Sequence, residues 1–163
     1  MIAITNFQLL ANFNTWANTK IFSACKKLDD EEYKKNRRAF FSSIHGTLNH
    51  LLVVDRAYIS RIEGIDHGLK SLDQILFESL LQLEEARIKE DKRLIDLVNN
   101  LSEESIHKEI TYKGFETGNT TYTINILLIT LFNHQTHHRG QIHNMLSQAG
   151  IKPPEIDIPD FIE

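Results

Sequence analysis

Residues 123–149 read TINILLITLFNHQTHHRGQIHNMLSQA, and this stretch decides the fold. It begins with β-branched residues that suit a strand, but its length and the continued spacing of its apolar residues favour one long helix. The helical spacing continues through Leu131, Ile142 and Met145. Gly150 follows, and a glycine in this place is typical of a helix C-terminus. We therefore predict a helix over about 123–149.

Three more segments repeat apolar residues with a helical period. They lie at about 6–28, 42–63 and 71–101, and each has the length of a helix rather than a strand. The third opens with Ser71-Leu72-Asp73-Gln74, which has the spacing of an N-terminal capping box. Four long amphipathic helices in one chain predict an all-α fold, a four-helix bundle, in which sites are built from side chains on facing helices.

The segment between the third and fourth helices has a different pattern. Ile110-Thr111-Tyr112 and Thr120-Thr121-Tyr122 flank a glycine-containing middle, which predicts a short hairpin or an extended excursion over 107–122, directly before the last helix. All three prolines lie at or beyond Pro153, so we expect the tail from 152 to 163 to be non-helical.

Length, charge and cysteine content limit the function classes. We expect residues 1–163 to form a single domain, because domains commonly have about 150 residues. The net charge of −4 is the opposite of the basic face that nucleic-acid binders need. The single cysteine, Cys25, cannot form an intramolecular disulfide, and we expect it to pack as a small apolar side chain. No signal peptide or membrane-spanning run is evident, so we expect a cytoplasmic protein that binds neither nucleic acid nor membranes.

Histidines gather at the centre of the last predicted helix. At about 100° per residue, His138 lies about 40° from His134, and both share the apolar face of Leu131. His137 falls at the edge of that face and His143 on the opposite one. Two imidazoles at i and i+4 can chelate one divalent ion, although the glutamate of a His-Glu-x-x-His motif is absent. The alternative is that both are core histidines with local hydrogen bonds, and the spacing alone does not decide.

A third ligand would have to come from another helix. The candidates are His45 and His50 on the second predicted helix. Only one of them can face a shared site, because they lie about 140° apart on a helical wheel. The wheel leaves that choice open. His67 and His107 fall in predicted loops and are expected to be surface residues. Glu104 and His107 have the spacing of a di-iron ligand pair, but the motif occurs once, so we discard it.

Four segments of the chain together form a recognisable pattern, namely NTWAN at 14–18, LNHLLVVDR at 48–56, HQTHHRGQ at 134–141 and AGIKPP at 149–154. With these segments the chain resembles the DinB/YfiT-like family of metal-dependent helical-bundle proteins. The resemblance covers nearly the whole chain in the right order, and its last histidine block is specific.

The resemblance implies a four-helix bundle, often a homodimer, that holds one divalent metal ion on three histidines. Carried over by position, the ligands would be His50, His134 and His138, with His137 as an alternative to its neighbour. Zinc and nickel suit such a set, and iron is a further option.

The same resemblance implies a chemistry. Three neutral imidazoles leave a coordination position open for water or a thiol. Because characterised relatives include thiol-dependent transferases, a thiol-dependent isomerase and hydrolase-like proteins, we expect an enzyme that activates a low-molecular-weight thiol or water against a small molecule. The alternative is a non-catalytic stress-response protein with a structural metal.

Several neighbouring residues have expected roles around this site. Gln141 shares the histidine face and is expected to orient an imidazole or the substrate. Asn18 and Trp16 are expected at the mouth of the pocket, with core packing as an equally good alternative for Trp16. Asp55 and Arg139 both lie on the inward-facing sides of their predicted helices, and we expect them to form a buried structural pair.

Overall fold

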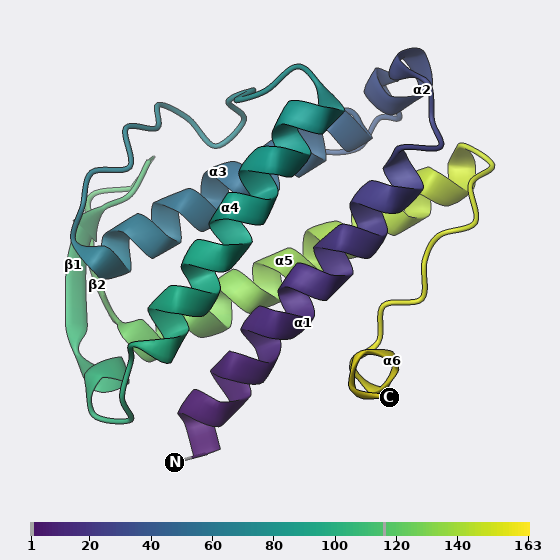
Figure 1. Cartoon of the computed structure of the whole chain (residues 1–163). Coiled ribbons are helices and arrows are strands. Elements are labelled where there is room, and N and C mark those ends of the chain that lie inside the picture. Colours follow the sequence, from purple (N-terminus) through teal and green to yellow (C-terminus); the bar gives the residue numbers. More distant parts are fainter. Residues whose placement is uncertain (1, 116) are drawn as a thin grey trace.

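The computed structural model describes residues 2–115 and 117–163 and is mostly helical (Figure 1). α1 packs against α4 and α5, and α3 packs against the same two helices. Figure 1 shows α1 and α5 running in one direction and α3 and α4 in the other. The inward faces of these helices therefore enclose one interior. The long helices are α1 (Ile2–Cys25), α3 (Ile44–Glu63), α4 (Leu80–Asn99) and α5 (Ile124–Gln148).

The interior has two apolar clusters with a polar layer between them. One cluster, which includes Leu52 and Leu83, lies toward the α2 end of the long helices. The other, which includes Ile59 and Leu94, lies toward the hairpin end. On α3 and α4 the residues between these positions include buried charged groups. Buried polar contacts therefore add to apolar packing in the middle of the molecule.

Side chains that accept from backbone N–H groups fix where two of the long helices begin. Ser43 accepts from Gly46 at the start of α3, and Thr123 accepts from Ile126 at the start of α5. At its other end α3 is closed by Gly64, whose φ of 73° is a left-handed conformation that favours glycine. These ends agree closely with the predicted helices over 42–63 and 123–149.

The predicted hairpin is present. β1 (Glu109–Lys113) pairs antiparallel with β2 (Asn119–Thr123), and Thr111 lies opposite Thr121. The short η1 helix (Ser105–His107) comes just before it. Since β2 leads directly into α5, the hairpin is anchored at the start of the helix that carries four histidines.

The predicted helix start at Ser71 is wrong. Residues 71–79 form no helix, and α4 begins at Leu80. The backbone N–H groups of Leu76 and Phe77 donate to the Asn49 side chain of α3, at 2.9 and 3.0 Å. These tertiary hydrogen bonds replace the helical ones that the capping pattern favours. Figure 1 shows the connection from α3 to α4 returning along the length of the long helices.

Besides η1, two short α-helices were not predicted. Asp29 accepts from the N–H of Glu32 and caps α2 (Asp30–Lys34). In the tail, α6 (Ile158–Ile162) carries Pro159 in its first turn, where a missing N–H costs nothing. The expectation that the tail is non-helical is therefore wrong for these five residues.

The structure bears on the expectations for Cys25 and for membrane-spanning segments. Cys25 is fully buried beside apolar residues, and burial raises the pKa of its thiol to about 12. It therefore packs as an apolar side chain and is not a reactive thiolate.

Among the described residues, no helix combines the length and apolar character needed to cross a membrane.

Candidate metal centre

Three histidines from two helices meet at the middle of the molecule. His50 comes from α3, and His134 and His138 lie one turn apart on α5. One ring nitrogen of each lies within 4.8 Å of the other two. The Nε2 atoms of His50 and His134 are 2.9 Å apart. Of the two candidates on the second helix, the structure thus brings His50, not His45, to the α5 pair.

Hydrogen bonds hold two of these rings with one nitrogen facing the cluster. Nδ1 of His50 lies 2.7 Å from the carbonyl oxygen of Leu72, and Nδ1 of His138 lies 2.8 Å from Oε1 of Gln141. Both acceptors are oxygens that cannot donate, so each Nδ1 carries the hydrogen and each neutral ring has its lone pair on Nε2. This is the arrangement in which outer residues orient imidazole ligands of a metal. Nδ1 of His134 is buried and has no hydrogen-bond partner among the described residues.

The cluster favours neutral imidazoles. Burial lowers the pKa of His50 to about 4 and the pKa of His134 to about 3. Burial also lowers the pKa of His138, although its hydrogen bond to Gln141 acts in the opposite direction. The three rings are therefore uncharged at neutral pH, and neutral imidazole is the form that binds a metal ion. A donor set of three neutral nitrogens fits zinc, nickel or iron.

We expect metal binding at this cluster to persist at mildly acidic pH. Three histidines with the ordinary pKa of about 6.5 would each be only about one-tenth neutral at pH 5.5, a loss of about a thousandfold in apparent affinity. Here the lowered pKa values of His50 and His134 keep both rings neutral at pH 5.5. Protonation of His138 alone should then lower the apparent metal affinity by at most about tenfold. Calorimetric zinc titrations at pH 7.5 and 5.5 measure this ratio. A thousandfold loss would contradict the expectation.

Phe41 covers one side of the cluster. Its ring stacks on the His50 ring with centroids 3.7 Å apart, and its centroid lies 5.6 Å from that of His138. The loop that carries Phe41 can approach α3 because Gly46 lacks a side chain, since a Cβ there would collide with the carbonyl oxygen of Phe41. Phe41 is thus an apolar wall that sequence reasoning missed.

The other histidines lie outside the cluster. Nε2 of His45 is 3.0 Å from the carbonyl oxygen of Phe77, so this buried ring holds the connection to α4. The His137 ring packs on His138 with centroids 4.8 Å apart, but it does not belong to the group whose nitrogens converge. His67 lies beside Phe115, and His107 ends the η1 helix.

Gln141 contacts the cluster as the sequence suggested. Its Oε1 accepts from His138, and its Nε2 lies 3.0 Å from Nε2 of His137. We expect Gln141→Ala to weaken zinc binding about tenfold, because residues that orient metal ligands typically contribute that much. Zinc titration of this variant beside Gln148→Ala, an exposed position on the same helix, measures the effect. Equal affinities of the two variants would remove Gln141 from this role.

The predicted pair of Asp55 and Arg139 is wrong in its partners. Asp55 pairs with Arg87 of α4, with an Nη1 to Oδ2 distance of 2.7 Å. Gln135 lies between the two predicted partners, since it donates to Asp55 and accepts from Arg139. Asp91, 3.0 Å from Arg87, completes the buried layer. The charged residues of this layer come from α3, α4 and α5. A prediction that pairs residues of only two helices could not identify these partners.

Asn18 and Trp16 do not line the mouth of the histidine site. The Asn18 amide donates to Asp91 at 3.0 Å and belongs to the buried layer. Trp16 packs against Phe13 and against Phe161 of α6, on the side of α1 that the tail covers. A place at the mouth of the site is therefore wrong for both residues, whereas the alternative of packing agrees with the aromatic contacts of Trp16.

The fold and the cluster define a mostly helical protein in which three histidines are close enough to hold one metal ion. The sequence profile of the DinB family matches residues 1–163, and the chain belongs to this family. It is 32% identical over 150 residues to Protein DinB of Bacillus subtilis (strain 168), covering 86% of this chain and 84% of that protein.

The chain is also similar to two further proteins. The uncharacterized protein YizA of the same organism is 26% identical over 142 residues, with 86% of each chain covered. The crystal structure of a DinB-like protein from Bacillus cereus ATCC 10987 matches with a TM-score of 0.64 at 20% identity. The match covers 88% of this chain and 92% of that one, and it supports the fold.

Proposed function

We propose that this protein binds one divalent metal ion at His50, His134 and His138 and uses it to activate a small thiol or water against a small-molecule substrate. The observation that carries the proposal is the convergence of three imidazole nitrogens within 4.8 Å. Hydrogen bonds and burial support it, because they keep the rings neutral and turn the lone pairs of His50 and His138 inward. Zinc or nickel fits this donor set best, and iron is a further option.

The surroundings of the cluster support a reactive rather than a closed site. A cleft of about 310 Å³ is lined by His50 and His134, so a small molecule can reach them from outside. A divalent ion held by the histidines would lower the pKa of a bound thiol or water and so supply a nucleophile at neutral pH. Phe41 stacks on the His50 ring and shields the face that it covers from water. His50, His134 and His138 would orient the ion, while the cleft would admit the electrophile.

A thiol-transfer assay tests the activity. Zinc-loaded or nickel-loaded protein is mixed with cysteine and 1-chloro-2,4-dinitrobenzene, and formation of the thioether is followed by absorbance. The thiol sulfur forms the new C–S bond, chloride leaves, and the thiol proton passes to solvent. We expect a rate well above that of the His138→Ala variant and close to that of His137→Ala. Equal rates for wild type and His138→Ala with both metals would contradict the transferase function.

A second candidate function follows from the burial of the site. His50 and His138 are buried, and His134 is half-buried, which also suits a structural metal in a non-catalytic stress-response protein. A structural ion should exchange slowly and raise the melting temperature steeply. A catalytic ion should accept cysteine as an added ligand. Slow zinc exchange that cysteine does not change would favour the structural role.

We also propose that the four long helices form a four-helix bundle of one domain and that two copies associate in the cytoplasm as a homodimer. Apolar side chains on the outside of α4 support the dimer, since an interface between two copies would cover them. Leu81 and Ile88 are exposed there, two turns apart on the same helical face. Light scattering after gel filtration tests it, and the mass of one chain, 18.9 kDa, at micromolar concentration would contradict it.

A further inference from the structure

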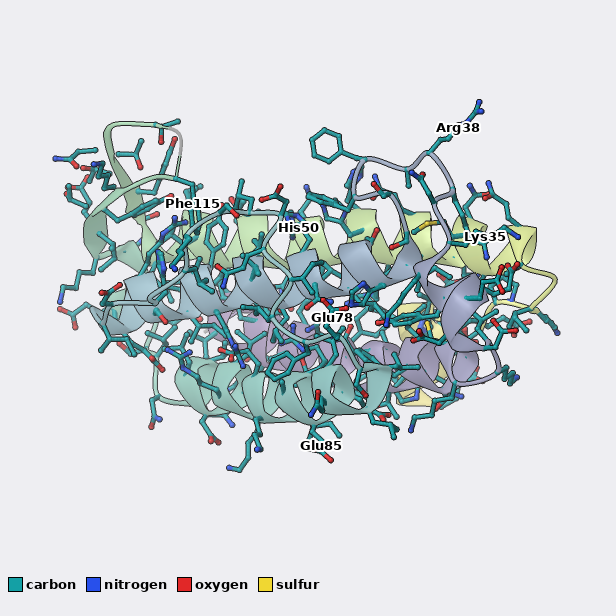
Figure 2. All side chains as sticks on the ribbon, turned by 90° about the horizontal axis from the view of Figure 1, so that it is seen from above. Lys35, Arg38, His50, Glu78, Glu85 and Phe115 are labelled. Atoms are coloured by element: carbon teal, nitrogen blue, oxygen red, sulfur yellow. The ribbon has the colours of Figure 1, made fainter. Side chains whose placement is uncertain are left out.

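One face of α3 forms the floor of the cleft beside the histidines. His50, Val54, Tyr58 and Arg61 line it, and they recur at the spacing of a single helical face. Arg61 lies about three turns from His50, or about 16 Å along the helix axis. Figure 2 shows His50 midway along α3 and Phe115, which also lines the cleft, toward the hairpin end. The cleft therefore runs from the histidine cluster to a cationic end.

Aromatic rings hold Arg61 at that end. The centre of its guanidinium lies 4.1 Å from the Tyr112 ring centroid, 5.3 Å from that of Tyr58 and 5.6 Å from that of Phe115. Tyr58 precedes Arg61 by three residues on α3, so the arginine side chain leans back toward the histidines. These contacts fix the flat guanidinium in place before any ligand arrives.

Arg61 has no acidic partner within the described part of the chain. None of the described carboxylates forms an ion pair with it, whereas Arg56, Arg87 and Arg93 all have one. Its Nε is buried and has no hydrogen-bond partner among the same residues. The two terminal nitrogens of Arg61 are not among the buried atoms without a partner, so they are the donors that a ligand in the cleft can reach. The planar group has the geometry to bind a carboxylate with two parallel hydrogen bonds.

We propose that this cleft binds a small organic acid, with Arg61 holding its carboxylate and the histidine cluster receiving its other end. The inference rests on the proposed function for what happens at the histidine end, but the carboxylate end stands on its own contacts. A carboxylate fits better than a phosphate ester, because Arg61 is the only Lys or Arg among the described residues that line the cleft. The aromatic walls and Val54 suit an apolar or neutral body between the two ends.

Calorimetry with a matched pair of probes tests this proposal. The whole chain, zinc-loaded and metal-free, is titrated with 6-mercaptohexanoate and with its neutral amide. We expect the acid to bind at least about tenfold more tightly than the amide, since charge-assisted hydrogen bonds are the stronger ones. Arg61→Gln should reduce this ratio to within about twofold. Arg56→Gln, on the same helix but paired with Glu90 outside the cleft, should keep it.

The outcomes separate this proposal from the metal site. One zinc per chain without a preference for the acid would overturn the carboxylate cleft and leave the proposed function intact. A preference for the acid that needs Arg61, but no zinc uptake, would support the cleft and contradict the proposed function. Equal preference in wild type and Arg61→Gln would also overturn the cleft. Thermal unfolding of each variant establishes that it is folded.

Discussion

Replacing Arg87 by methionine is expected to lower the free energy of unfolding by about 3–5 kcal/mol at pH 7.5. Arg87 is only 3% exposed and lies between two buried carboxylates, Asp55 and Asp91, at 2.7 and 3.0 Å. Methionine fills a similar space but leaves both carboxylates without their main cation. Gln135 and Asn18 still donate to them, but neutral amides do not replace a charge. Urea unfolding of both proteins measures the difference.

The effect of Arg87→Met should shrink as the pH falls. Burial raises the pKa of Asp55 to about 6 and raises the pKa of Asp91, while Arg87 lowers both. Without Arg87 these pKa values rise further, so the folded variant takes up protons that the unfolded chain does not. A folded pKa above the unfolded one adds stability as the pH falls through it, and the deficit at pH 5 should be smaller than at pH 7.5.

Arg56→Met is the matched control for Arg87→Met. Arg56 pairs with Glu90 at 3.0 Å, but Glu90 keeps Arg93 as a second partner at 2.8 Å. We expect this variant to lose no more than about 1 kcal/mol. A loss below about 1 kcal/mol for Arg87→Met as well would contradict the account of the buried layer.

Replacing His134 by alanine is expected to weaken zinc binding by about a hundredfold or more. Residues that only orient a metal ligand contribute about 10–100-fold, and loss of a ligand should cost at least as much. The variant should also remain folded, because it removes a buried Nδ1 that has no partner among the described residues. Competition with a chromophoric chelator measures the affinity.

His137→Ala and His45→Ala serve as controls for His134→Ala. His137 neighbours the cluster on the same helix, and His45 is buried on α3 but bonds to Phe77. The ring nitrogens of His137 and His45 do not belong to the converging group of candidate ligands. The zinc affinity of both variants should therefore stay within about threefold of wild type. A loss in His137→Ala as large as that in His134→Ala would reassign the ligands.

Helical periodicity accounts for much of the fold and part of the candidate site. The spacing of His134 and His138 placed them on one face of one helix, and both rings meet in the structure. The wheel did not choose between His45 and His50, because that choice depends on how α3 is rotated against α5. Only the family resemblance indicated His50. The cationic end was readable in principle, since Arg61 lies eleven residues beyond His50 and so on the same helical face.

Contacts between distant segments account for what the sequence did not predict. The Asn49 side chain binds the backbone of Leu76 and Phe77, 27 and 28 residues further on, and so prevents the helix that Ser71 appeared to start. Asp55 was expected to pair with Arg139 because both face inward. Its partner is Arg87 on a third helix, which pairwise helical wheels do not consider.

Metal content per chain is the most direct test of the central claim. Untagged wild-type protein and the His138→Ala and His137→Ala variants are loaded with zinc or nickel, dialysed, and analysed for bound metal by elemental analysis. We expect about one metal ion per chain in wild type and in His137→Ala, and none in His138→Ala. No bound metal in wild type after loading with either ion would contradict it, and the three histidines would then be core residues with no metal-dependent function.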